Sequence, residues 1–353
     1  MTIAQWWDKE RGYMQPISGS LLLGGICYGP TFFHLFSRYS LPSMLAKANY
    51  EALQHAVIVL YTDESTQWAL EALARESPLR MIVRVMPPEV MAGDFWPRLS
   101  AAQGLLCVLA ARSNMPFHML MPDQVYCEDY FRPLMAMGEK YRRIAHNGLN
   151  VHYDVSATLR TYIYGGALSI SPRALTDLSW PNLHYRMSPF VFNACTTLAE
   201  QGIRLDPERM PNCHYQVWRA RERVMIFSPH NNTAYMDAAT CRQLDLDAPP
   251  VNSLDAIVQT LFGHEYYIPR LQDDMAFIGL EYSSPDAHPQ NGFHIPLTQF
   301  IERCREETHR NAAYLDCFSR ASEMPASVDE GCPLASDVMA TQQALVHQMR
   351  DGP

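Results

Sequence analysis

Short apolar runs alternate with helix-like segments over the first 125 residues. The apolar runs occupy residues 20–28, 56–62, 80–86 and 117–121. Helical spacing or helix-start signals mark residues 30–38, 66–75 and 96–113. Continuous apolar runs of this length are typical of strands buried on both faces. The alternation therefore predicts an α/β fold with a doubly wound, mostly parallel sheet and helices on both faces.

The alternation weakens after residue 125. Helical patterns cover residues 130–141, 171–179 and 189–201, and a strand is expected at 142–153 with a hairpin turn at Asn147-Gly148. Residues from about 323 have no clear apolar face until a last helix near 338–349. These patterns predict an α+β or helical extension at the C-terminal side.

Charge and cysteine usage narrow the function classes. The net charge is −9 and no dense Lys/Arg run occurs, so a nucleic-acid partner is not expected. The nine cysteines form no CxxC pair, which favours reduced thiols and a cytoplasmic protein. The polar start does not resemble a signal peptide, and the apolar run Leu21 to Cys27 is too short to span a bilayer. Trp6 and Trp7 are expected to pack against the body of the protein.

Polar residues that follow the predicted strands are the first candidates for a site. Ligands of open parallel sheets bind beyond the carboxyl ends of the strands. Tyr28 and Thr31 follow the first apolar run, Thr62 and Asp63 end the second, and Asp123 follows the fourth. We therefore expect these five residues to lie at one edge of the sheet.

Acidic residues near the fourth strand offer two kinds of chemistry. Asp123 could present a carboxylate to a divalent cation that neutralises a diphosphate, or could be a turn residue that bonds its own backbone. Glu128 and Asp129 could act as a general base, or could cap the helix that begins near Tyr130.

Histidines in the middle of the chain suggest a further possibility. His214 and His230 lie in polar surroundings, and with Asp237 they could form the metal site of a hydrolase, although their spacing matches no known ligand motif. The chain has no GxGxxG fingerprint, no GxxxxGK[ST] loop and no GxSxG elbow. Dinucleotide oxidoreductases, phosphate-loop nucleotidases and α/β-hydrolases are thereby disfavoured.

Four stretches of the chain together resemble one family. They are GGICYGPTFFHLFSRYSLPSMLAKANYEAL (24–53), AVIVLYTDEST (56–66), MLMPDQVYCEDYF (119–131), and the run ISPRALTDLSWPNLH with HYQVW and FSPHNN downstream. With gaps, they cover roughly residues 20–280. The chain resembles a largely uncharacterised bacterial family related to GT-A-type glycosyltransferases, which have the nucleotide-diphospho-sugar transferase fold.

The resemblance assigns expected roles to the candidate residues. It implies that Tyr28, Thr31, Thr62 and Asp63 contact the nucleotide of a sugar donor. Asp123 matches the first acid of a motif that holds manganese or magnesium, and His230 is the match for a histidine that completes the metal site. Val125 stands where a second acid is expected.

The expected function is transfer of a sugar from a nucleoside diphosphate sugar to a hydroxyl of a glycan, protein or small-molecule acceptor. Glu128, Asp129 or Asp237 would take the acceptor proton. Residues 1–155 would form the donor-binding half, 156–322 the acceptor half, and 323–353 a tail. The alternative is a degenerate sugar-nucleotide-like fold that binds without catalysis, because the second acid is missing.

Overall fold

A computed structural model describes most of the N-terminal half of the chain and selected segments beyond it. The described residues are 1–145, 148–179, 182, 191–193, 216–220, 223–227, 233–244, 246–250, 275–282 and 322–324. The predicted helix near 338–349 lies outside these residues. No helix in the described part is both long and apolar enough to cross a membrane.

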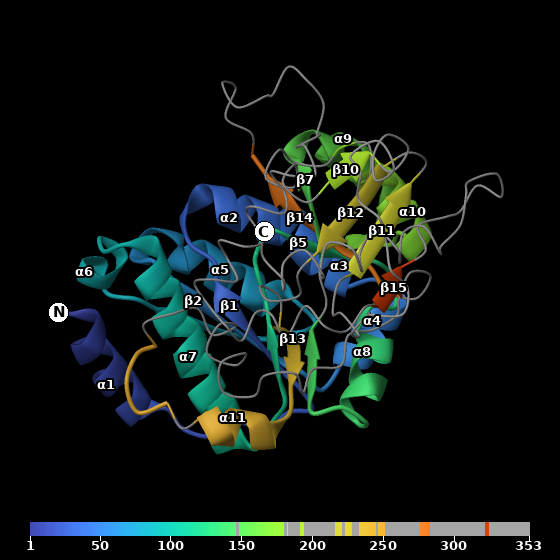
Figure 1. Cartoon of the computed structure of the whole chain (residues 1–353). Helices are drawn as coiled ribbons and strands as arrows, with labels where there is room; N and C mark the ends of the chain where they lie inside the picture. Colours follow the sequence, from blue (N-terminus) through green and yellow to red (C-terminus); the bar gives the residue numbers. More distant parts are fainter. Residues whose placement is uncertain are drawn as a thin grey trace, which may run out of the picture.

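A mostly parallel sheet forms the centre of the protein (Figure 1). Its strands stand in the order β3-β2-β1-β4-β13-β6. They are β1 (Leu22–Ile26), β2 (Val57–Thr62), β3 (Arg80–Val85), β4 (Phe117–Met119), β6 (Arg143–Ala145) and β13 (Thr233–Met236). The first four are parallel neighbours, whereas β13 runs antiparallel to β4 and β6. The predicted strand positions and the parallel pairing are confirmed.

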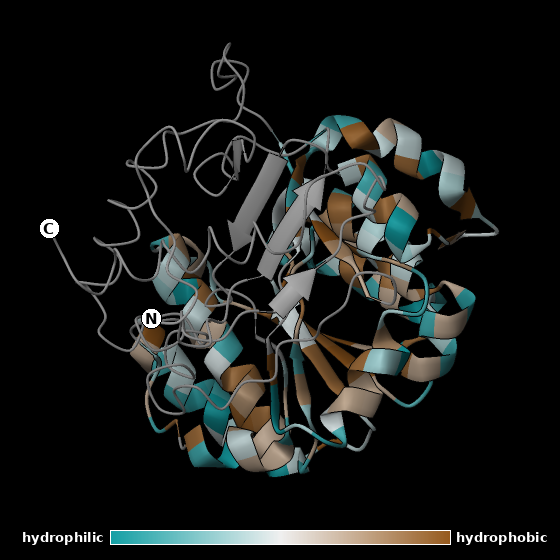
Figure 2. Ribbon diagram, turned by 45° about the vertical axis from the view of Figure 1, so that its right-hand side comes forward, coloured by the Kyte–Doolittle hydropathy of each residue, from teal (hydrophilic) through white to brown (hydrophobic). Residues whose placement is uncertain are grey.

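Helices cover both faces of this sheet, as the alternation predicts. On one face α1 (Ile3–Tyr13), α7 (Phe95–Ser113) and α11 (Ala238–Leu244) share a core with one set of β1 and β2 side chains. On the other face lie α2 (Gly29–Leu35), α3 (Leu41–Met44), α4 (Lys47–Leu53), α5 (Glu64–Glu76) and α8 (Phe131–Gly138). Figure 2 shows the hydrophobic strands between helices whose hydrophilic residues face outward. The arrangement is a doubly wound α/β sheet.

Alternate residues of the central strands divide between the two cores. In β1, Leu23 belongs to the core that includes α2 to α5, whereas Leu22 packs in the core of α1 and α7. In β2, Ile58 and Val59 divide in the same way. Side chains of a strand point alternately to opposite faces, so a strand buried on both sides must be apolar at every position. This requirement explains the continuous apolar runs in the sequence.

The N-terminal helix α1 packs against α7, and its two tryptophans are part of the core. Trp6 is 2% exposed and Trp7 is fully buried. The Trp6 ring meets the ring of Tyr61 edge-to-face, with centroids 5.5 Å apart. The expectation that both tryptophans pack against the body is confirmed.

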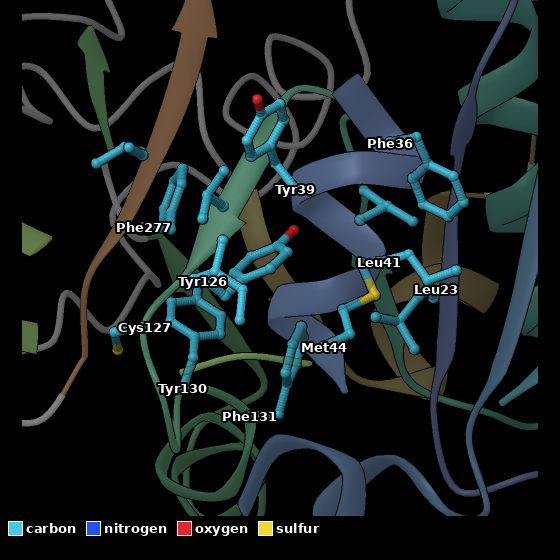
Figure 3. Packing of buried hydrophobic residues seen from close by; sticks show 14 of the residues in the cluster. Leu23, Phe36, Tyr39, Leu41, Met44, Tyr126, Cys127, Tyr130, Phe131 and Phe277 are labelled. Carbon is cyan, nitrogen blue, oxygen red and sulfur yellow. The ribbon is translucent and has the colours of Figure 1, made fainter. Parts of the chain in front are cut away.

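A smaller sheet extends the second core. Its strands are ordered β5-β14-β7, with bounds β5 (Gln124–Tyr126), β14 (Phe277–Glu281) and β7 (Leu149–His152). Figure 3 shows the aromatic cluster between this sheet and the helices, in which Tyr126, Tyr130, Phe131 and Phe277 pack together. This cluster holds the segment after β4 against the main sheet.

The remaining elements are short. A hairpin joins β8 (Ile163–Tyr164) to β9 (Ala167–Leu168) through Gly165 and Gly166, whose φ angles of 58° and 85° favour glycine. α6 (Pro88–Met91) precedes α7, and α10 (Pro172–Ser179) lies where a helix is predicted. A third sheet has the order β10-β12-β11-β15, with bounds β10 (Val191–Asn193), β12 (Arg223–Phe227), β11 (Gln216–Ala220) and β15 (Ser322–Met324).

Two local predictions are wrong. The segment 142–153 is not one strand with a hairpin, because β6 pairs with β13 in the main sheet and β7 pairs with β14 in the smaller one. The predicted helix at 189–201 contains the strand β10. Both errors arise where strand partners come from distant parts of the sequence, which local patterns do not encode.

Candidate functional site

Three adjacent parallel strands deliver polar residues to the same edge of the main sheet. Tyr28 follows β1, Asp63 follows β2, and Asp123 follows β4 by four residues. β1 lies between β2 and β4 and is parallel to both. The chain beyond β1 stays close to its neighbours, because the Cys27 amide donates to the Tyr61 carbonyl at 2.8 Å. The carboxyl ends of the three strands therefore meet at one edge.

The thiol of Cys27, just after β1, is buried. Burial raises the pKa of the Cys27 thiol, and the charges of Asp63 and Asp123 raise it further. Asp63 and Asp123, sixty residues apart in the sequence, follow the two strands that flank β1 in the sheet.

Thr62 is the last residue of β2, and Asp63 follows it. Their side chains differ in hydrogen bonding. The Asp63 carboxylate accepts a hydrogen bond from the Thr66 amide at 2.7 Å and caps α5. Thr62 is fully buried, and its Oγ1 has no hydrogen-bond partner among the described residues. A buried hydroxyl without a partner is uncommon, and ligand binding is one way to satisfy it. Thr31, in the first turn of α2, is exposed to solvent.

Arg98 joins this edge, and sequence reasoning missed it. Its guanidinium carbon lies 4.7 Å from the centroid of the Tyr28 ring, a cation–π geometry. Arg98 is 6% exposed; its Nη1 donates to the Met91 carbonyl, and its Nε is buried with no hydrogen-bond partner in the described structure. An arginine in the first turn of a helix is unfavourable for the helix dipole. The sequence signal that could have identified Arg98 is its charge at the start of the otherwise apolar helix predicted at 96–113.

Asp123 lies in the turn between β4 and β5. Its carbonyl accepts a hydrogen bond from the Leu280 amide at 3.0 Å, which ties this turn to β14. The side chain is half-buried. Val125, two residues later, is fully buried in the core on β5. The position of the expected second acid is therefore a packing position.

The acids that follow β5 contact neighbouring loops and helices. The Glu128 carboxylate accepts a hydrogen bond from the Ser169 hydroxyl at 2.5 Å. Asp129 lies 3.2 Å from Arg132 and has a φ of 62°, which places it in the left-handed region. Among the described residues, the Asp129 Oδ1 has no hydrogen-bond partner in suitable geometry, so its contact with Arg132 is an ion pair. These contacts connect the acids to β9 and α8.

Asp237 lies at the opposite edge of the main sheet. It follows β13, which is antiparallel to β4 and pairs Met236 with Phe117 at the start of β4. Its carboxylate accepts a hydrogen bond from the Thr240 amide at 2.6 Å and another from Arg142 at 3.1 Å. Asp237 thus begins α11, and the structure does not bring it together with Asp123.

We predict that Asp237 contributes to stability in a pH-dependent way. Burial raises the pKa of this carboxyl group, but the hydrogen bonds from Thr240 and Arg142 outweigh it, and the net pKa is lowered. A lowered folded-state pKa stabilises the protein above the unfolded value of about 4 and loses this effect as pH falls through the folded value. Asp237→Ala should lower the free energy of unfolding by about 1–2 kcal/mol at pH 7, as loss of a helix cap does.

Urea unfolding at pH 7 and pH 3 measures this effect, and the gap between the two proteins should shrink at pH 3. Asp247→Ala is the matched control, because the carboxylate of Asp247 is 74% exposed and pairs only with Arg11 among described residues. Its effect should stay below about 1 kcal/mol. A gap that is the same at both pH values would contradict the assignment.

Two predicted histidines lie outside the described residues, His214 and His230. Within the described part of the chain, no group of three His, Cys, Asp or Glu side chains is arranged to hold a metal ion. The described cysteines, Cys27, Cys107, Cys127 and Cys241, are free and buried. Of the two predicted metal ligands, Asp123 and His230, only Asp123 lies among the described residues.

Comparisons with known proteins identify weak structural likenesses. No protein-family model and no curated protein matches the sequence. The structure of S. aureus TarS aligns with a TM-score of 0.41 at 10% identity over 85% of this chain, which spans 43% of the TarS chain. A shorter TarS structure in complex with UDP-GlcNAc has a TM-score of 0.38 at 11% identity and covers 85% of this chain and 72% of that one.

Two other similar structures are named as transferases. Inositol-1-phosphate CTP transferase from T. maritima has a TM-score of 0.32 at 8% identity, covering 78% of this chain and 94% of that one. Mouse xyloside xylosyltransferase 1 has a TM-score of 0.25 at 18% identity, covering 42% and 57%. Because these scores are low, the roles proposed below rest on this chain's own residues.

Proposed function

We propose that this chain is a glycosyltransferase that moves a sugar from a nucleoside diphosphate sugar to an acceptor hydroxyl. The observation that carries the proposal is the convergence of Tyr28, Asp63 and Asp123 at the carboxyl ends of three adjacent parallel strands. This edge is where α/β sheets bind nucleotides. The buried cation of Arg98 beside Tyr28 adds a group suited to a diphosphate.

Each residue at this edge has a role in the proposal. Tyr28 offers an aromatic face to the base, and Asp63 offers a carboxylate to hydroxyls of the ribose. The unpartnered hydroxyl of Thr62 and the exposed hydroxyl of Thr31 supply further hydrogen bonds to the nucleotide. Arg98 stabilises the negative charge that develops on the departing diphosphate. These groups are held by strand ends and helix starts, which are rigid parts of the fold.

A divalent cation, manganese or magnesium, is part of the proposal. Magnesium is commonly held by one or two carboxylates together with phosphate oxygens of the substrate, so the single carboxylate of Asp123 fits such a site. His230 would be the second protein ligand. When bound, the cation would neutralise charge on the leaving diphosphate. Asp123 would place it beside the sugar-bearing phosphate.

The acceptor must lose a proton during transfer. In the proposal, Glu128 or Asp129 takes it, since both carboxylates belong to the segment that continues from Asp123 through β5. Ser169 and Arg132 hold these two side chains in place. Asp237, the third acid considered, lies at the other edge of the sheet and caps α11. The acceptor in the proposal is a hydroxyl of a glycan, a protein or a small molecule.

A second candidate function is binding without catalysis. The buried Val125 favours it, because the position of a second metal-binding acid is occupied by a core side chain. A protein of this kind would keep the nucleotide contacts at Tyr28 and Asp63 but would not transfer the sugar. Ligand binding and turnover therefore have to be measured separately.

Thermal unfolding with nucleotides tests donor binding. We expect UDP, GDP or CMP, with manganese, to raise the unfolding temperature, since a ligand at 100 times its dissociation constant adds about 2.7 kcal/mol. Arg98→Gln should reduce the shift, whereas the exposed-arginine variant Arg173→Ala, on α10, should keep it. The absence of a shift with every nucleotide would refute the donor site. A shift without hydrolysis or transfer of any sugar nucleotide would support the binding-only function.

A further inference from the structure

A pocket lies beside α2, formed by residues that the proposed donor site does not use. Its volume is about 370 Å³. It is lined by His34, Arg38, Tyr39, Tyr153, Arg160 and Ile163. Pockets of roughly 300–1,000 Å³ commonly hold small molecules. None of the lining residues is acidic, and two are arginines.

An irregular helix brings one side of this pocket into place. After α2 the chain forms a π-helical turn, Phe36–Ser40, in which the Leu41 amide donates to the Phe36 carbonyl. Such wider turns interrupt α-helices and occur frequently at functional sites. Here the π turn carries both Arg38 and Tyr39. In Figure 3 the Tyr39 hydroxyl points away from the hydrophobic cluster that packs around Tyr126.

Short helical turns after β7 supply the other side. They are η2 (Tyr153–Val155), α9 (Ser156–Leu159) and η3 (Arg160–Tyr162), which lead into β8. The Arg160 Nε lies 3.4 Å from the Ser156 carbonyl, one helical turn earlier. This contact helps to position the Arg160 guanidinium. The positive charge of Arg160 acts to lower the pKa of the Tyr39 and Tyr153 hydroxyls.

Aromatic side chains form well-supported walls. The Tyr153 hydroxyl lies 2.9 Å from His34 Nε2, and the Tyr153 ring stacks on Tyr282 with centroids 4.2 Å apart. Burial raises the pKa of Tyr153, but hydrogen bonds from Tyr39 and Tyr282 outweigh it and the net pKa is lowered. The Tyr153 hydroxyl is therefore held by hydrogen bonds at the wall of the pocket.

The charge of the pocket is positive and uncompensated within the described structure. Arg38 and Arg160 are exposed, and no described carboxylate lies within ion-pair distance of either guanidinium. Arginine forks match the geometry of phosphate and carboxylate groups. The whole protein carries a net charge of −9, so it does not attract anions in general. Two arginines facing one cavity in an acidic protein therefore mark a local anion site.

We infer that this pocket binds a small molecule that carries an oxyanion, such as a phosphate ester or a carboxylate, on a body the size of a sugar. Arg38 and Arg160 hold the oxyanion, and the hydrogen-bonded pair of His34 and Tyr153 lies beside it. The rings of Tyr39 and Tyr153 and the side chain of Ile163 contact the uncharged body. This inference does not depend on the proposed transferase activity, because the two sites share no residue.

Isothermal titration of the whole chain tests the inference with three probes: glucose 6-phosphate, glucuronate and neutral glucose. We expect saturable binding of at least one anionic probe and at least tenfold weaker binding of glucose. Binding of glucose 6-phosphate alone indicates a phosphate ester, and binding of glucuronate alone indicates a carboxylate. Equal affinity for glucose and the anionic probes, or no saturable binding of any probe, would overturn the inference.

Variants connect the binding to this pocket. Arg160→Ala and Arg38→Ala should each weaken the anionic probe at least tenfold, with partial recovery in Arg160→Lys. Tyr153→Phe removes the hydroxyl and keeps the stacked ring, so it should weaken binding without loss of the fold. Arg75→Ala, at an exposed arginine in the last turn of α5, changes the net charge equally and should leave the affinity unchanged.

A different pattern among these variants would contradict the site. Equal loss in Arg75→Ala and Arg160→Ala would indicate a general charge effect. Unchanged affinity in both pocket-arginine variants would place the ligand elsewhere. Binding of UDP provides the separation from the donor edge: it should persist in Arg160→Ala and decrease in Arg98→Gln, so either site can fail without the other.

Discussion

Asp123→Ala is expected to lower sugar transfer at least ~100-fold, the size of effect found when one group that stabilises transition-state charge is removed. In the proposed site this carboxylate would position a cation at the leaving diphosphate, and the position of the expected second acid of the motif is the buried Val125. Turnover with the nucleotide sugar that gives the largest thermal shift is the measurement. The loss should appear in kcat more than in KM.

The fold should tolerate the Asp123 substitution. The backbone carbonyl of Asp123, and not its side chain, accepts the hydrogen bond from Leu280, so alanine keeps this link to β14. Asp177→Ala, a surface acid on α10 that pairs with Arg173, provides a control of equal charge change and should retain full turnover. Unchanged turnover in Asp123→Ala would rule out the assigned role, whereas unfolding of that variant would show up in its circular dichroism.

The centre of the main sheet could be predicted because β1 and β2 are buried on both faces. Runs such as residues 57–61 are apolar at every position, and this local property is visible without knowledge of the partners. The strand order then brings Tyr28, Asp63 and Asp123 to one edge, as expected for parallel strands linked by helices. The sequence pattern and the physics of parallel sheets were sufficient for this part.

Elements with distant partners were harder to predict. β7 is parallel to β14, more than a hundred residues later in the chain, so the hairpin signal at Asn147-Gly148 was misleading. Asp237 looked like a possible base because it is an acid in a polar stretch, but β13 runs antiparallel and ends at the opposite edge. Arg98 was overlooked because its contact with Tyr28 joins residues seventy positions apart. In each case the decisive contact is absent from local sequence.

The second large effect concerns Gly25, where β1 passes closest to the chain after β4. A Cβ atom at this position would lie 1.9 Å from the carbonyl oxygen of Leu120. The Leu120 amide in turn donates to the Gly24 carbonyl at 2.9 Å, so the two segments are held together. Because the obstacle is backbone, no change of rotamer can relieve the overlap.

Gly25→Ala is therefore expected to lower the free energy of unfolding by at least about 3 kcal/mol, at the upper end of overpacking effects. Gly24→Ala should cost less, because its Cβ would meet the flexible Leu106 side chain at 2.9 Å. Gly12→Ala, in α1 with nothing within 4 Å, should be neutral or gain up to about 1 kcal/mol. Urea unfolding of the three variants gives the ranking. A Gly25 variant as stable as the Gly12 variant would mean that β1 and the Asp123 turn are not in close contact, and the shared edge proposed for the donor would lose its structural basis.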